Sequence, residues 1–128
     1  MVTEESLKTW LEAYGRAWEN RDAELVASLF TEDATYQETP FSEPMRGRAA
    51  ISDYWLRVVV QAQEQIQFGS EILAINGNLA FARWWSSFTR ISTGRPVRLN
   101  GIFVLNFSNP TQCDELREWW MRQDGATP

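Results

Sequence analysis

The chain has 128 residues, of which 44% are hydrophobic and 23% charged, and its formal net charge is −5. This composition is typical of one globular domain, and the acidic charge argues against nucleic acid and anionic membrane surfaces as partners. No apolar run is long enough to cross a bilayer, and histidine, the commonest general base and zinc ligand, is absent. The one cysteine, Cys113, allows no internal disulfide, and no secretory signal is recognisable, so we expect a cytoplasmic protein.

The N-terminal half of the sequence predicts three helices. The first is expected over about 3–20, because apolar residues recur there at i, i+4, i+7 and i+11. These residues are Leu7, Leu11, Tyr14 and Trp18. Asp22 is placed to cap a short second helix, and a third is expected over about 49–63. Thr35 and Tyr36 favour a strand between the second and third helices, which Pro40 and Pro44 keep short.

The C-terminal half predicts an antiparallel meander of four strands. They are expected over 65–75, 79–90, 97–107 and 114–122, and the first alternates, with Ile66, Phe68 and Ile72 on one face. Asn76-Gly77 is a strong hairpin signal between the first two. Helices followed by a meander indicate a single α+β domain over 1–128, ordered to about residue 124.

The predicted strands carry apolar residues on both faces. Helices can cover only the concave face of a single sheet, so the other face needs a different partner. We expect a homodimer through the convex face; the alternative is a monomer with scattered exposed aromatics. The interface is expected to involve some of the residues Trp84, Ser86, Phe88, Trp119 and Met121.

Three segments carry a family resemblance: 22–25 (DAEL), 29–36 (LFTEDATY) and 47–51 (GRAAI). Their order and spacing resemble the nuclear transport factor 2-like superfamily, which includes SnoaL-like polyketide cyclases, ketosteroid isomerases, limonene epoxide hydrolases and scytalone dehydratases. The resemblance implies a cone-shaped fold in which three N-terminal helices pack on a curved antiparallel sheet and enclose one pocket. Such motifs identify a fold and do not identify a ligand.

The resemblance to ketosteroid isomerase implies two site residues. Tyr14 lies where that enzyme carries its oxyanion-donating tyrosine, and Glu38 lies where it carries its general-base aspartate. The isomerase's second oxyanion donor, an aspartic acid on the penultimate strand, has Phe103 at its position, and residues 72–112 contain no acidic residue. The alternatives are that Tyr14 is a core aromatic and Glu38 a solvated loop carboxylate.

Two charged residues interrupt apolar faces of the predicted strands. On the superfamily pattern Arg83 and Glu118 point inward, so we expect them to pair in the cavity opposite Tyr14, since either alone would be costly to bury. Glu118 also resembles the acid–base residue that SnoaL-like cyclases keep on the last strand. The alternatives are a structural ion pair or a pair that faces outward.

The resulting hypothesis is a pocket protein for a small apolar organic ligand. The reaction would be acid–base chemistry without cofactor or metal, namely isomerisation, cyclisation or hydration, with Glu118, Glu38, Tyr14 and Arg83 as catalytic residues. The residues expected to contact the substrate are Trp18, Trp55, Trp85, Phe103 and Trp120. Two alternatives are a non-catalytic ligand-binding module and a dimerisation module whose pocket is filled by its own aromatics.

Overall fold

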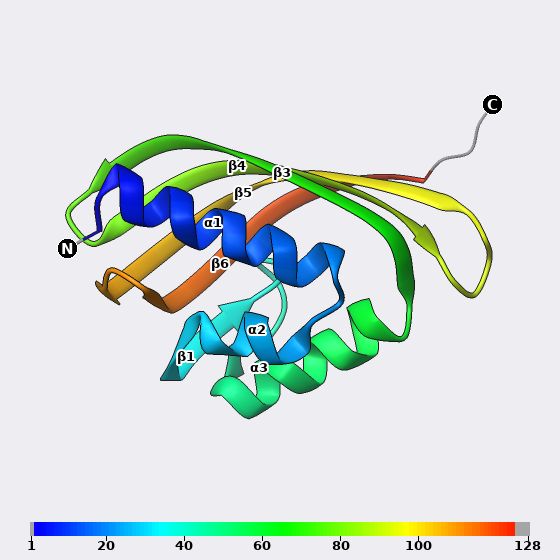
Figure 1. The fold of residues 1–128 in the computed structure, drawn as a ribbon, viewed down its shortest axis with the longest axis horizontal. Coiled ribbons are helices and arrows are strands. Elements are labelled where there is room, and N and C mark those ends of the chain that lie inside the picture. The colour runs from blue at the N-terminus through cyan, green and yellow to red at the C-terminus, as the bar shows by residue number, and fades with distance from the viewer. Residues whose placement is uncertain (1, 125–128) are drawn as a thin grey trace.

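The computed structural model describes residues 2–124 as a curved sheet with helices packed on one of its faces (Figure 1). The six strands follow the spatial order β2-β1-β6-β5-β4-β3. The helices precede most of the sheet in sequence, which confirms the predicted α+β arrangement. The sequence predicted an ordered domain up to about residue 124, and the residues after it lie outside the part of the chain that the structure describes.

Helix α1 (Glu4–Glu19) begins after the cap Thr3, and α2 (Ala23–Ser28) begins after the predicted cap Asp22. The Thr3 hydroxyl accepts the Ser6 amide hydrogen at 3.0 Å, and the Ser6 hydroxyl accepts that of Thr3 at 2.9 Å. Asp22 Oδ1 accepts the Leu25 amide hydrogen at 3.0 Å. The whole predicted apolar stripe of α1 is buried, so this helix supplies aromatic side chains to the interior.

The third helix is shorter than predicted. Helix α3 spans Arg48–Trp55 and continues into a five-residue π-helical segment, η1 (Leu56–Val60). The predicted end near Gln63 is therefore wrong, because β3 already begins at that residue. The run Val58-Val59-Val60 gives the reason, since β-branched side chains disfavour a regular α-helix.

The strands are β1 (Phe30–Gln37), β2 (Met45–Arg46), β3 (Gln63–Asn76), β4 (Leu79–Arg90), β5 (Pro96–Asn109) and β6 (Gln112–Asp124). β3 to β6 form the predicted antiparallel meander, and β1 joins it by parallel pairing with β6. The β3–β4 turn uses Gly77 at φ 64°, a conformation that glycine adopts without strain. The meander places the inward residues of four consecutive strands on one surface.

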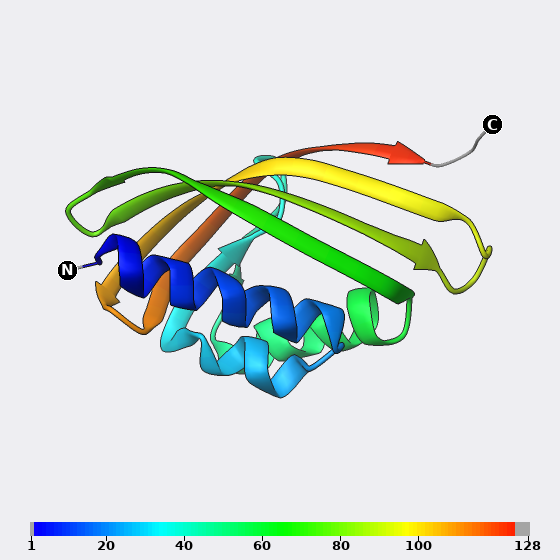
Figure 2. The same cartoon turned by 45° about the horizontal axis from the view of Figure 1, so that its top comes forward.

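The core lies between the helices and the inner face of the sheet. All the helices lie on that side, while the hairpin between β4 and β5 and the end of β6 extend beyond them (Figure 2). Trp10 anchors α1 by donating its indole hydrogen to the Leu29 carbonyl oxygen at 2.8 Å. Within residues 2–124, no helix combines the length and apolar character needed to cross a membrane.

Candidate active site

The inner end of the site is a pair of tyrosine hydroxyls. Tyr14 from α1 and Tyr36 from β1 are 1% and 3% exposed, and their hydroxyl oxygens lie 2.7 Å apart. Burial raises the pKa of both phenols, so both remain neutral. One hydroxyl proton is used in the contact between them, which leaves the other available to a carboxyl group or a ligand.

Glu118 on β6 is a buried carboxyl group, only 6% exposed, on the same inner face. Within residues 2–124 it forms no salt bridge. Burial raises the pKa of Glu118 well above its usual value, the hydroxyl of Tyr36 acts in the opposite direction, and the charge of Glu38 raises the pKa further. The geometry therefore favours a neutral carboxylic acid beside the two phenols.

Glu38, in the segment after β1, is held at the cavity by two aromatic residues. The Tyr54 hydroxyl donates to Glu38 Oε2 at 2.6 Å, and Trp120 Nε1 donates to the Glu38 carbonyl oxygen at 2.7 Å. Burial raises the pKa of Tyr54, as does its hydrogen bond to Glu38, so the phenol keeps its proton. Glu38 is only partly buried, unlike Glu118. The two carboxyl groups thus occupy different environments.

These groups line one cavity of about 200 Å³. Its walls come from α1, α3, η1 and the inner faces of β1, β3, β4, β5 and β6. Most of its lining is aromatic or aliphatic, and Glu38 and Glu118 are the carboxyl groups on it. An apolar cavity with few polar groups is the usual form of a site for a small organic ligand.

The structure brings together most, but not all, of the predicted site residues. Tyr14, Glu38 and Glu118 line the cavity, as do Trp18, Trp55 and Trp120. Phe103 lies behind the wall, where its ring stacks on Trp84 with the centroids 5.2 Å apart. Phe103 is therefore not on the cavity wall as predicted, and Trp84 lines the cavity instead.

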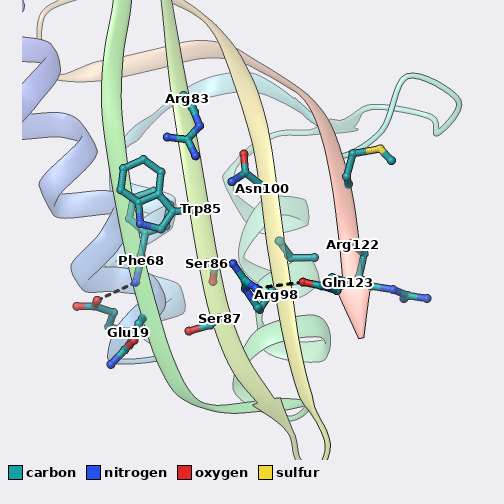
Figure 3. Close-up of a pocket in the computed structure, with 13 residues that line it drawn as sticks. Glu19, Phe68, Arg83, Trp85, Ser86, Ser87, Arg98, Asn100, Arg122 and Gln123 are labelled. Carbon is teal, nitrogen blue, oxygen red and sulfur yellow. Dashed lines mark hydrogen bonds between the residues drawn. The ribbon is translucent and has the colours of Figure 1, made fainter. Parts of the chain in front are cut away.

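The predicted placement of Arg83 and Trp85 is wrong, because both point to the outer face of the sheet. Arg83 pairs there with Glu71 at 3.8 Å and lies 4.8 Å above the Trp85 ring, so it does not pair with Glu118. Figure 3 shows both side chains in a groove of about 870 Å³ on the side of the strands away from the helices.

The register explains this error. Ala82 is the β4 residue opposite Phe103, and Phe103 is opposite Glu118, so even-numbered β4 residues face inward. Because β4 carries bulky residues on both faces, alternation shows which residues share a face but not which face is buried. Trp84, Ser86 and Phe88 were accordingly misplaced at the dimer face and are buried inside. Trp119 and Met121 are exposed on the outer side, as expected.

Sequence reasoning missed five polar residues of the cavity: Tyr36, Tyr54, Gln63, Arg90 and Arg122. Alternation could have found Tyr36, two residues before Glu38, and Arg122, two residues after Trp120. The other three are brought to the cavity by tertiary contacts that no local pattern indicates. No group of three potential metal ligands among His, Cys, Asp and Glu occurs in the part of the chain that the structure describes.

The fold and the cavity define a protein of the nuclear transport factor 2-like class. The family model of the SnoaL-like domain matches residues 11–110, and the chain belongs to that family. Among curated proteins, none matches the sequence significantly.

Solved structures share the fold at low sequence identity. The epoxide hydrolase/cyclase-like enzyme SalBIII, described as acting in pyran ring formation in the polyether salinomycin, has 22% identity and a TM-score of 0.80, covering 94% of this chain and 95% of SalBIII. A ketosteroid isomerase-like protein from Catenulispora acidiphila has 17% identity and a TM-score of 0.75, covering 92% and 86%. A type 2 hexachlorocyclohexane dehydrochlorinase has 8% identity and a TM-score of 0.78, covering 95% and 88%. These likenesses establish the fold alone.

Proposed function

We propose that the chain is a cofactor-independent acid–base enzyme for a small, largely apolar organic molecule. The observation that carries this proposal is the pair of carboxyl groups on one aromatic cavity: Glu118 is buried and forms no salt bridge within residues 2–124, and Glu38 is held at the edge. Groups that differ in this way can divide the roles of acid and base. The open volume supports a ligand over the alternative in which the protein's own aromatics fill the pocket.

Glu118 would act as a neutral hydrogen-bond donor to an oxygen atom of the substrate. Ketosteroid isomerase uses a carboxylic acid kept neutral by an apolar site in this way. At the position of that acid this chain has Phe103, but Glu118 lies directly across from Phe103 on the neighbouring strand. A carboxyl group from β6 would thus replace the one missing from β5, next to Tyr14 and Tyr36. Together these groups would stabilise negative charge on a substrate oxygen.

Glu38 would accept the proton that leaves the substrate. Tyr54 donates to its Oε2 atom, which orients the carboxyl group and leaves Oε1 for the reacting hydrogen. Removing a proton beside a carbonyl group creates an enolate, whose oxygen the donors at the inner end would bind. Isomerisation and aldol-type cyclisation can both begin from such a step, whereas in a hydration Glu38 would take its proton from the attacking water. A non-catalytic ligand-binding module is the alternative that the following experiment separates.

The elimination of 5-nitrobenzisoxazole tests this arrangement without knowledge of the natural substrate. A base removes the ring C–H proton, those electrons form a nitrile, and the N–O bond breaks to release a coloured phenoxide. We expect the wild-type protein to accelerate this reaction at pH 7, and Glu38→Gln to lower kcat/KM at least tenfold. Tyr14→Phe should also lower it, because the phenoxide oxygen loses a donor.

Glu43→Gln is the matched control, since Glu43 is an exposed carboxylate five residues further along. It should retain the wild-type rate, and circular dichroism should show that all variants are folded. Turnover that is unchanged in folded Glu38→Gln would remove Glu38 from the mechanism. Wild-type protein no faster than buffer would favour the binding module instead.

We also propose a cytoplasmic homodimer that associates through the outer sheet face. Trp85, Trp119 and Met121 are 38%, 43% and 78% exposed on that face, which is an unusual grouping of large apolar side chains. The single buried thiol of Cys113 fits a reducing compartment. Light scattering at micromolar concentration should give the mass of two chains, and Met121→Glu should give that of one. A monomeric wild-type protein contradicts the dimer.

A further inference from the structure

We propose that the cavity ends in a carboxylate-binding subsite formed by Arg90 and Gln63, so that the ligand is an apolar organic acid. This inference rests on the cavity of the proposed function and specifies its substrate class. The two residues are direct partners in the β3–β4 register and both line the cavity. Directly opposite residues of an antiparallel pair project from the same face with their side chains adjacent.

Gln63 presents unused hydrogen-bond donors in this position. It is only 5% exposed, and its side-chain oxygen accepts the Trp18 indole hydrogen at 2.7 Å. Because an indole nitrogen can only donate, the atom of Gln63 that it contacts must be the oxygen, and the amide nitrogen is the free end. Within residues 2–124 that nitrogen has no hydrogen-bond partner. The nitrogen is not sealed in the core, so its two donors face the cavity and can meet an acceptor on a ligand there.

Arg90 supplies positive charge at the same point. Its guanidinium lies 5.8 Å from the centre of the Phe88 ring and forms no ion pair with any of residues 2–124. Its backbone is fixed at the start of the β4–β5 hairpin, where its amide donates to the Arg95 carbonyl oxygen at 2.9 Å. Arg122 of β6 also lines the cavity, but it is paired with Asp124 at 3.1 Å, whereas Arg90 is not paired in the part of the chain that the structure describes. A guanidinium fork beside an amide matches the two oxygens of a carboxylate.

The subsite and Glu118 lie at different positions along the strands. Residues that pair directly across neighbouring strands form one row of the sheet. Glu118 shares its row with Phe103 and Ala82, whereas Gln63 and Arg90 form the row at the far end of β4. Between the two rows the inner face carries Trp84 and Phe88, and also Arg122 opposite Leu99. A ligand whose carboxylate binds Arg90 would extend its apolar part toward Glu118. There Glu118 and the tyrosine hydroxyls could donate to another oxygen atom of the ligand.

The test compares two probes of equal shape and different charge, 4-phenylbutyrate and 4-phenylbutyramide. Calorimetric titration at pH 7 should show that the acid binds wild-type protein at least tenfold more tightly than the amide. Arg90→Met keeps the apolar stem and removes the charge, and should reduce this preference to near unity. Gln63→Glu keeps an acceptor for Trp18 while removing the donors, and should also weaken binding of the acid.

Arg95→Met is the matched control, because Arg95 is exposed in the same hairpin. Its replacement changes the net charge of the protein by the same amount as Arg90→Met. It should keep the wild-type preference. Equal binding of both probes, binding of neither at millimolar concentration, or an unchanged preference in folded Arg90→Met would each overturn the proposal. These are binding measurements, so failure of the Glu38 test would leave them standing, and their failure would leave that test standing.

Discussion

Replacing Glu118 with Gln should stabilise the folded chain at alkaline pH and change its stability little below pH 4. Burial raises the folded-state pKa of Glu118, so the unfolded chain loses its proton first as the pH rises. The contribution of Glu118 to stability is therefore lost as the pH rises from about 4.3 through its folded pKa. Gln has no proton to lose. The difference in unfolding free energy should therefore increase as the pH rises from 4 toward the folded-state pKa of Glu118.

Urea unfolding followed by tryptophan fluorescence between pH 4 and pH 9 measures this difference directly. Glu64→Gln is the matched control, because Glu64 is an exposed glutamate on a strand, and its effect should be small at every pH. Other titrating groups are common to wild type and variant and cancel in the comparison. If the gap between wild type and Glu118→Gln did not grow with pH, Glu118 would already be ionised in the folded protein. The role of a neutral donor would then be lost.

The fold was predictable where local patterns and tertiary packing agree. The prediction of α1 succeeded because its apolar stripe is buried in the structure: Leu7, Leu11, Tyr14 and Trp18. Asn76-Gly77 predicted the β3–β4 hairpin because its conformation depends on these two residues alone. Such signals operate within a few residues and need no knowledge of the rest of the chain.

The candidate site was predictable only in part, because its geometry depends on which strand face is buried. For β6 the inward placement of Glu118 was correct, whereas for β4 the placement of Arg83 was one residue out of phase. Trp84 and Trp85 are adjacent and lie on opposite faces of the strand, so hydrophobicity does not indicate which face is buried. The partners of Glu38 were unpredictable for a different reason, since Tyr54 and Trp120 reach it from distant elements.

Gly101→Ala should destabilise the protein by about 3 kcal/mol, because there is no room for a methyl group at this point of the sheet. Gly101 lies between Trp84 and Trp120 in the register, in the middle of the inner face. A Cβ atom there would overlap the Trp119 carbonyl oxygen and would lie 2.7 Å from Trp120 Cβ. Backbone atoms of a central strand cannot move aside as the end of a flexible side chain can.

Gly101→Ala should also alter the geometry of the candidate active site. Displacing Trp120 would disturb the hydrogen bond from its indole to the Glu38 carbonyl oxygen, which is 2.7 Å long. We therefore expect folded Gly101→Ala, at a temperature well below its midpoint, to eliminate 5-nitrobenzisoxazole more slowly than wild type. Asn100→Ala, next in the chain and exposed on the outer face, should change stability by less than about 0.5 kcal/mol and leave the rate unchanged. Equal stability of the two variants in urea would show that β5 and β6 can separate to admit a side chain. The close packing of Gly101 would then have no part in holding Trp120 against Glu38.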